Sequence, residues 1–521
     1  MAITINEKLA EALARAGNAA LGNIVNSNSI SPKERSLLTR HGYLKKIIRS
    51  WYLLDADLLA ENAGESALWF ESIWAFIGQY LGEKFGTDYY LSPEASLDLL
   101  TGNNALPNQI IAFTKNSAST NTKVSLPNNM SLLILGTSKE PYQTIYYKNS
   151  VYTHSLESAL VECAPRIYTS NPVSVQLAIK SSDINKLSEA ILTTKNTNSG
   201  NRIIGALEAL EMKPESRNLE TIMKGAGLDI STRLNPFEEV LIPLGGRKGE
   251  SPSSTRVRTF WNKMRPAVIE VFDDLPPTFE FKKRSIRDTL SMIEELYVSD
   301  AYNSLSIEGY QVTPELIKKV AEGDWSPETQ SKDKEQKDAL AAKGYFDAFN
   351  KVKDLINEAY QTEGELDLEY LISVGLTEWY TALFQPCISV GIIQVIDLAG
   401  YRKGPIYIRG SKHVPPPSEQ LMDCMDALKE LINEEEHFIV KAILGHLSLG
   451  YIHPFPDGNG RSARFLMNFL LILGGYPWAI VQLRERTQYL SSLESASVDG
   501  NITPFSEFIK SSIKVTSTLI V

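Results

Sequence analysis

The densest group of residues able to do chemistry lies between His453 and Arg464. A histidine that can take up a proton near neutral pH is followed four positions later by Asp457, a hard oxygen ligand, and then by two arginines three positions apart. Two glycines and an asparagine between them predict a sharp loop at the start of a helix, where free backbone N–H groups attract an anion. Proton acceptor, metal ligand and anion site together indicate phosphoryl or nucleotidyl transfer.

Two apolar segments flank this loop and must position it. One begins at Phe438 and leads into the loop, and the other, Phe465–Leu473, leaves it. Arg461 and Arg464 would share one face of the outgoing helix, where a bound polyphosphate offsets the unfavourable helix dipole. Taken singly, each residue is explained equally well by structure alone, His453 as a packed loop residue for example. Their occurrence together within one short segment favours the chemical interpretation.

The segment His453–Arg464 matches the motif HxFx[DE]GNGRxxR at every defined position, so the C-terminal region resembles the Fic family of AMP-transferring enzymes. The resemblance implies an all-helical core, with His453 as the base that deprotonates a Ser, Thr or Tyr hydroxyl of a target protein. That hydroxyl attacks the α-phosphorus of ATP. Asp457 would hold Mg²⁺ and Phe455 would pack the loop onto the core. The implied phosphate-binding residues are Gly458, Asn459, Gly460, Arg461 and Arg464. The phosphorylating branch carries Lys at position 460, so glycine there favours transfer of AMP.

Two further segments extend the resemblance. A predicted strand pair before Pro415 is similar to the family's β-hairpin flap, which would bind an extended target segment by main-chain pairing. Its residues are Ile406, Tyr407, Ile408 and Arg409. Tyr489 and Leu490 fall where the family builds its adenine pocket. The alternative interpretation, an ordinary hairpin and a core aromatic, stays open for both segments, and His446 is expected to face the core.

An inhibitory signature of the same family, [ST]xxxE[GN], matches Ser304–Gly309. A helix that ends at Gly309 would place Glu308 in its last turn, where the helix dipole disfavours a carboxylate unless a cation pairs with it. The resemblance assigns that cation to Arg464 and predicts a bidentate pair that withholds Arg464 from ATP. The chain is therefore expected to be an autoinhibited protein adenylyltransferase. Alternatively, Glu308 orients a water that removes AMP from a modified target.

The first 60 residues predict a winged helix-turn-helix. Apolar residues at helical spacing run from Leu9 to Ile24, Ser31-Pro32 starts a second helix, and residues 43–54 alternate like a hairpin. Basic residues that could bind DNA concentrate here: Arg35, Arg40, Lys45, Lys46 and Arg49. The region loosely resembles antitoxins of type IV abortive-infection systems, which suggests a toxin–antitoxin context and a DNA-binding regulator. A protein-docking module is the alternative.

The length of 521 residues predicts about three domains, and the net charge of −10 argues against a protein coated in nucleic acid. We expect a multidomain α+β protein with a winged helix at 1–60, a mixed α/β domain at 61–240, a linker at 241–284 and a Fic domain at 285–521. In the mixed domain, a helix around Trp69 and strands at 109–113 and 131–134 are predicted, with an Asn-rich loop between the strands.

Three widely spaced cysteines exclude a disulfide framework, and no segment reads as a signal sequence or a membrane span. These features predict a cytoplasmic protein that works without a membrane. Its expected partners are ATP, a target protein with a hydroxyl side chain, DNA at the N-terminal domain, and a second copy in a homodimer.

Overall fold

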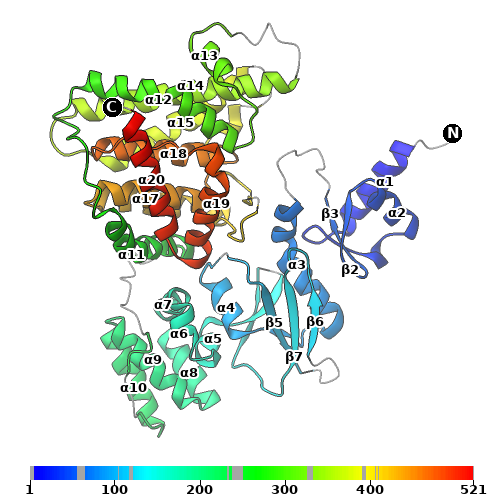
Figure 1. The fold of residues 1–521 in the computed structure, drawn as a ribbon. Helices are drawn as coiled ribbons and strands as arrows, with labels where there is room; N and C mark the ends of the chain where they lie inside the picture. The colour runs from blue at the N-terminus through cyan, green and yellow to red at the C-terminus, as the bar shows by residue number, and fades with distance from the viewer. Residues whose placement is uncertain are drawn as a thin grey trace. The chain divides into compact units, whose positions relative to one another are not determined.

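The computed structural model divides the chain into two compact units (Figure 1). The first unit comprises Met1–Leu241 and the short segment Ile406–Val414, and the second comprises Ile242–Pro405 and Pro415–Val521. The structure describes residues 5–55, 65–103, 105–115, 121–148, 150–230, 234–237, 250–325, 333–389, 393, 395–404, 406–408 and 410–519. No helix among these residues is long and apolar enough to cross a membrane.

The first unit begins with α1 (Ile5–Ala19), β1 (Ile24–Asn26), η1 (Ser27–Ser29), α2 (Pro32–Arg40), β2 (Leu44–Ile48) and β3 (Trp51–Leu54). The strands form an antiparallel sheet in the order β1-β3-β2. The predicted start of α2 is confirmed, because the Ser31 hydroxyl accepts from the N–H of Glu34 and Pro32 is the first helical residue. The hairpin is also confirmed. The first helix is shorter than expected, since Ile24 belongs to β1.

A second sheet follows the long helix α3 (Glu65–Phe85). Its strands are β4 (Tyr90–Leu91), β5 (Gln109–Thr114), β6 (Thr122–Ser125) and β7 (Ser131–Gly136), in the order β4-β5-β7-β6. The helix and the two strands predicted here are confirmed. The Asn-rich loop prediction is wrong over Thr122–Ser125, because these residues pair with β7 as an edge strand. Trp69 and Ile73 of α3 share a core with Ile110 and Leu132 of the sheet.

The remainder of the first unit is helical apart from one hairpin, β8 (Thr144–Tyr147) with β9 (Val151–His154). Figure 1 shows α7 to α10 gathered as a separate helical layer. The helices are α4 (Pro93–Leu100), α5 (Leu156–Glu162), α6 (Ile167–Ser170), α7 (Pro172–Ser181), α8 (Ile184–Thr194), α9 (Thr197–Ala209) and α10 (Lys213–Gly225). Their apolar faces form one core, which includes Leu160, Ile191 and Ile204.

The second unit is helical throughout its described residues. Its elements are α11 (Pro252–Phe272), α12 (Ile286–Ile307), α13 (Pro314–Ala321), α14 (Asp333–Gln361), α15 (Leu368–Ser389), η4 (Val395–Leu398), η5 (Ser418–Gln420), α16 (Leu421–Glu434), α17 (Phe438–Ile452), α18 (Asn459–Leu473), η6 (Leu483–Glu485), α19 (Arg486–Glu494), η7 (Ser495–Asp499) and α20 (Thr503–Leu519). Helices α17 and α18 lie at the centre, and almost every residue of both is buried. This rigid pair holds the loop 453–458 between them.

The linker predicted at 241–284 is wrong over Pro252–Phe272. These residues form α11, whose Val257, Trp261 and Val268 are buried in the core of the second unit. The serines and the proline that indicated a linker instead begin the helix, because Ser251 caps it and Pro252 occupies its first turn. Residues 244–249, the glycine-rich part of that prediction, lie outside the described residues.

Candidate active site

The loop 453–458 turns sharply because two of its residues adopt left-handed backbone conformations. His453 ends α17 with a φ of 52°, and its N–H donates to the carbonyl of Leu449 at 2.9 Å. Gly458 begins α18 with a φ of 76°, and a Cβ there would meet Phe384 at 2.9 Å. Glycine satisfies both requirements at 458. A non-glycine residue in this conformation at 453 is uncommon and costs backbone energy, which the surrounding packing sustains.

Asn459, at the start of α18, bonds to the backbone in the middle of the loop. Its Oδ1 accepts from the N–H of Phe455 at 2.9 Å, and its Nδ2 donates to the carbonyl of Phe455 at 2.7 Å. The Phe455 ring stacks on Tyr380 with centroids 4.2 Å apart. Phe455 therefore packs the loop onto the core, as the resemblance implied. Asn459, expected to bind the anion, contacts the loop backbone with both ends of its amide.

The ring of His453 is oriented by its own helix. Its Nδ1 lies 3.1 Å from the carbonyl of Gly450, and a carbonyl can only accept a hydrogen bond, so Nδ1 carries the proton. In the neutral ring this leaves Nε2 as an acceptor. Burial lowers the pKa of His453 to about 4, more than the Gly450 carbonyl raises it. The imidazole is therefore neutral at physiological pH and able to take a proton.

Arg402 is a positioning residue that the sequence analysis did not assign. Its side-chain Nε donates to the carbonyl of His453 at 2.8 Å, and its backbone N–H donates to the carbonyl of Pro454 at 2.8 Å. Its guanidinium also donates to the carbonyls of Gly404 and Pro416. One buried side chain thus connects the start of the loop to the segments on either side of the predicted flap. The Gly-Tyr-Arg run beside the flap was the only sequence signal for it.

Arg464 is bound on two sides by α12. Its Nη2 lies 2.7 Å from Glu308 Oε1, and its Nε and Nη2 donate to the hydroxyl and carbonyl of Ser304 at 2.9 and 3.2 Å. The predicted Glu308–Arg464 contact is confirmed, but the bidentate geometry is wrong. Ser304 accepts from the Nε and Nη2 edge of the guanidinium, so Glu308 binds Arg464 through one carboxylate oxygen only. The inhibitory role of this contact stays a prediction.

The end of α12 is built to place Glu308. Gly309 has a φ of 94°, its N–H donates to the Ser306 carbonyl, and the N–H of Tyr310 donates to the Leu305 carbonyl. This pair of bonds is a Schellman ending. Burial would raise the pKa of Glu308, but the charges of Arg464 and Arg461 and the hydrogen bond from Arg464 lower it below its ordinary value. Glu308 is accordingly a carboxylate.

Gly460 is required by the close approach of the Glu308 carboxylate. A Cβ at position 460 would lie 2.4 Å from Glu308 Oε1 and 3.3 Å from Arg464 Nη1. Since Cβ contacts under 3.0 Å essentially never occur, no larger residue could stand here with Glu308 in this pose. The sequence analysis assigned Gly460 to the anion site alone and did not foresee this contact.

Arg461 is buried with part of its guanidinium unpaired. Its side chain is 1% exposed, and its charge lies over the rings of Tyr310 and Phe384 at 5.3 and 5.1 Å. Nη2 lies 3.4 Å from Asp457 Oδ1, yet Nη2 and Nε lack hydrogen-bond partners among the described residues. Unpaired N–H groups of a buried cation are costly and are satisfied by an anion.

Asp457 is the metal ligand predicted from the sequence. Its side chain is 53% exposed, and its Oδ1 accepts from the N–H of Gly458 at 2.6 Å. No cluster of three or more His, Cys, Asp or Glu placed to hold a metal occurs in the described part of the chain. A single exposed carboxylate beside an anion site fits a Mg²⁺ that takes its other ligands from ATP and water.

Tyr489 is buried in the core of the second unit. Its hydroxyl lies 2.9 Å from His446 Nε2, and its ring contacts Phe505 and Phe508. Burial, and next the charge of Arg464, lower the pKa of His446 to about 3, so this histidine is a neutral core residue, as expected. Leu490, the other residue assigned to the adenine pocket, is 39% exposed.

The predicted flap is not a hairpin in its described residues. Ile406, Tyr407 and Ile408 form no strand, and the N–H of Ser411 donates to the Ile408 carbonyl across a turn. Arg409 lies outside the described residues. The β propensity of the segment is outweighed because no second strand of the second unit pairs with it in the described residues. Its one bridge, His413 with Ala105, lies within the first unit.

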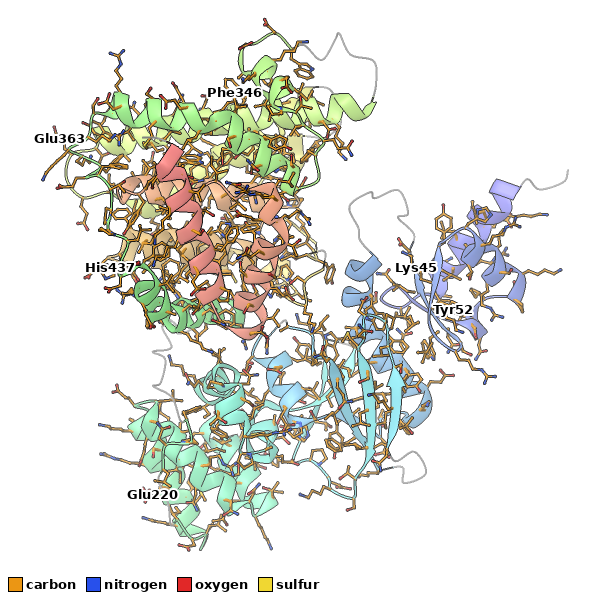
Figure 2. The ribbon with its side chains drawn as sticks, in the orientation of Figure 1. Lys45, Tyr52, Glu220, Phe346, Glu363 and His437 are labelled. Carbon is orange, nitrogen blue, oxygen red and sulfur yellow. The ribbon has the colours of Figure 1, made fainter. Side chains whose placement is uncertain are left out.

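The residues predicted to bind DNA lie on the first sheet and on α2. Arg40, Lys46 and Arg49 are exposed, and Arg35 is half-buried. Lys45, labelled in Figure 2 on β2, lies 3.1 Å from Asp55 in an ion pair. Part of the positive charge counted from the sequence is therefore neutralised.

Comparison with known proteins agrees with this geometry. The model of the Fic/DOC family matches residues 375–471, which run from α15 to α18 and include the whole loop. The chain contains a Fic domain.

Relatives of the Fic domain carry the name protein adenylyltransferase Fic. One from Drosophila grimshawi is 30% identical over 275 residues, covering 50% of this chain and 51% of the relative. Another from Nematostella vectensis is 30% identical over 226 residues, covering 42% of this chain and 47% of the relative. The chain thus spans about half the length of the curated relatives it matches. A solved Fic-1 fragment from C. elegans is 18% identical over 68% of this chain and 98% of its own, with a TM-score of 0.37.

Proposed function

We propose that the Fic domain transfers AMP from ATP to a hydroxyl side chain of a target protein and that Glu308 restrains this activity. The observation that carries the proposal is the arrangement around the loop. The neutral His453 has Nε2 as acceptor, the buried Arg461 has two nitrogens without hydrogen-bond partners among the described residues, and Arg464 is bound by Glu308. The name shared by the relatives favours transfer of AMP over its removal.

In the proposed reaction, Nε2 of His453 takes the proton of the target hydroxyl as its oxygen attacks the α-phosphorus of ATP. The new bond is the phosphoester to AMP, and the bond that breaks releases pyrophosphate. Arg461 offers its unpaired N–H groups to the phosphates, and the N-terminus of α18 adds backbone N–H donors. Asp457 would hold Mg²⁺, which neutralises phosphate charge when bound.

The restraint follows from the occupation of Arg464. Its Nη2 atom is bound to Glu308, and its Nε and Nη2 donate to Ser304, so a phosphate must displace the carboxylate to gain Nη2 of this arginine. The Glu308 carboxylate also lies over Gly460, at the first turn of α18. An anion placed at that turn would meet a negative charge. ATP is then bound without the productive placement of its phosphates.

The test compares Glu308→Gly with a matched control in the same chain. Glu322 ends α13 and is followed by Gly323 with a φ of 81°, the same local geometry as Glu308 with Gly309, but among the described residues it forms no ion pair such as that of Glu308 with Arg464. We expect Glu308→Gly to incorporate label from α-labelled ATP and Mg²⁺ into protein, including the enzyme itself. Glu322→Gly should remain at the level of the unchanged chain. Adding His453→Ala to the Glu308→Gly variant should remove the label.

An unlabelled Glu308→Gly variant that folds normally would overturn the transferase proposal. Label from γ-labelled ATP, with none from α-labelled ATP, would show transfer of phosphate instead. Mass spectrometry of the labelled proteins, searching for the added mass of AMP, then identifies the residue modified.

For the first unit we propose a winged helix that binds DNA. Support comes from the order α1-β1-α2-β2-β3 and from the exposed Arg40, Lys46 and Arg49. A gel shift on the DNA upstream of the chain's own gene should weaken steeply with salt. Lys46→Ala with Arg49→Ala should reduce that salt slope by about two, since each phosphate contact contributes about one. The control Lys123→Ala with Lys186→Ala removes equal charge elsewhere in the unit. Absence of any shift at low salt would favour the protein-docking alternative.

A further inference from the structure

The segment Ile406–Val414, predicted to bind the target protein, belongs structurally to the first unit. It is separated in sequence from the rest of that unit by more than 160 residues, yet it groups with Met1–Leu241. Tyr407 and Val414 pack against the core formed by α3 and the second sheet. The segment is therefore inserted in the Fic half of the sequence but is supported by another part of the chain.

Main-chain bonding attaches the segment at its second half. Ala105 and His413 form an antiparallel bridge, and the N–H of Leu106 donates to the carbonyl of Lys412 at 3.1 Å. Nζ of Lys412 donates to Asn108 Oδ1 at 3.0 Å. His413 is 2% exposed. The bridge, the backbone bond and the side-chain bond all involve residues 105–108, which directly precede β5.

Residues 105–108 are in turn joined to the second sheet. They lead directly into β5, and the carbonyl of Asn108 accepts from the N–H of Ser131 on β7. Strand β4 pairs only with Ala112 and Phe113, so the edge of β5 beside its first residues is not covered by β4. The segment therefore joins the chain directly ahead of β5, through one isolated bridge outside the strands of the sheet.

We propose that the first unit positions the target-binding segment of the Fic domain, with Leu106 and Asn108 as positioning residues for target recognition. The proposal rests on the proposed function. The segment forms no strand of its own, and these bonds fix the backbone of its second half. An extended target chain needs a fixed backbone to pair with. Loss of the attachment should weaken binding of the target protein and leave binding of ATP unchanged.

The test uses the full chain with Glu308→Gly, and as substrate the protein that this variant labels most strongly in a cell extract, purified. Asn108→Ala with Lys412→Ala removes the side-chain bond, and Leu106→Pro removes the donated N–H. We expect each to raise KM for that protein roughly three- to tenfold, the usual worth of a hydrogen bond, with kcat and the affinity for ATP unchanged. Lys123→Ala, an exposed lysine on the same sheet, is the control.

A disulfide gives the opposite perturbation. The Leu106–Lys412 bond identifies Ala105 and His413 as a pair that does not exchange hydrogen bonds, the closer type of cross-strand pair. Ala105→Cys with His413→Cys should therefore close under oxidation and retain labelling of the substrate. Loss of labelling on oxidation, restored by reduction, would mean that the attachment inhibits, and would overturn the proposal.

The outcomes separate this proposal from the proposed function. If the Glu308→Gly chain labels no protein, the adenylyltransferase activity fails and KM has no meaning. The other case is that the Glu308→Gly chain labels its substrate, while both attachment variants are folded by circular dichroism and keep the original KM. Only the positioning role is then refuted. Since Leu106 is buried and proline there can disturb the sheet, the Asn108 and Lys412 variant decides when the two disagree.

Discussion

Two groups of positively charged residues in the molecule differ in burial. Arg461 and Arg464 lie inside the Fic domain with side chains 1% and 4% exposed, whereas Arg40, Lys46 and Arg49 lie on the surface of the first unit. Removal from water makes each buried charge dependent on a specific partner, and solvent screening leaves each surface charge nearly independent of its neighbours. The state of each buried arginine is therefore set by its individual contacts, whereas the surface residues act only through their total charge.

The largest expected effect tests the buried pair. Arg464→Ala removes the partner of Glu308, whose side chain is 33% exposed, and leaves that carboxylate facing only Arg461. Breaking a buried pair costs about 3–5 kcal/mol, and partial exposure should reduce this to about 2–4 kcal/mol. Chemical unfolding of the second unit measures it. Arg40→Ala, the surface counterpart, should stay within about 0.5 kcal/mol.

A second variant distinguishes loss of the pair from loss of packing. Adding Glu308→Ala to Arg464→Ala removes the uncompensated carboxylate and should restore part of the stability. If the double variant is no more stable than Arg464→Ala, the ion pair is not what holds α12 to α18.

Asn459→Ala should give the next largest effect. It leaves the N–H and the carbonyl of the buried Phe455 without their partners, at about 1–3 kcal/mol for each group. We expect a lower unfolding temperature and, in the Glu308→Gly chain, slower AMP transfer because the loop loses its shape. Asn501→Ala, whose amide caps an exposed turn at Thr503, is the control. Unchanged stability would show that the amide does not hold the loop.

The pH dependence of AMP transfer reports the burial of His453. Its pKa is lowered to about 4, and the base must be neutral, so activity is present above that value and is lost as the pH falls through it. The Glu308→Gly chain should therefore be nearly as active at about pH 5.5 as at neutral pH. A decline centred at the ordinary histidine value would show that the imidazole is solvated during turnover.

The smallest expected effect belongs to the surface. Asp55→Asn removes the ion pair with Lys45, whose side chain is 31% exposed, and should change the free energy of unfolding by less than about 1 kcal/mol. It should also strengthen binding of the first unit to DNA slightly, because the charge of Lys45 is then no longer compensated by the Asp55 carboxylate. A change in the free energy of unfolding as large as that of Arg464→Ala would contradict the difference between the buried and the surface charges.

Local signals predicted the parts of the fold that local chemistry controls. Ser31 and Pro32 start α2, Gly309 ends α12, and the apolar run after Arg464 forms α18, all as expected. The same signals gave a wrong prediction where one sequence pattern is typical of two different structures. Ser251 and Pro252 read as a linker but cap the buried α11, because capping and turn residues are the same.

Within the site, the identity of the residues was predictable and their partners were less so. The motif fixed His453 and the two arginines, and the inhibitory signature named Glu308. Ser304 as the second acceptor of Arg464, and Arg402 at the carbonyl of His453, could not be found, because their contacts join residues 160 and 51 positions apart. The resemblance assigned Tyr489 to the adenine pocket, with a core aromatic as the alternative, and the structure places it in a core beside His446.

The sequence by itself determined which groups carry the chemistry, since residue type and short-range spacing decide protonation chemistry, helix faces and caps. Only the tertiary structure decided which charges are paired and which segment supports which. In the second unit, Nε and Nη2 of the buried Arg461 lack hydrogen-bond partners among the described residues, whereas Arg464 is bound by Glu308, although both arginines read alike in the sequence. The attachment of Lys412 and His413 to the residues before β5 likewise joins positions some 300 residues apart, which no local pattern encodes.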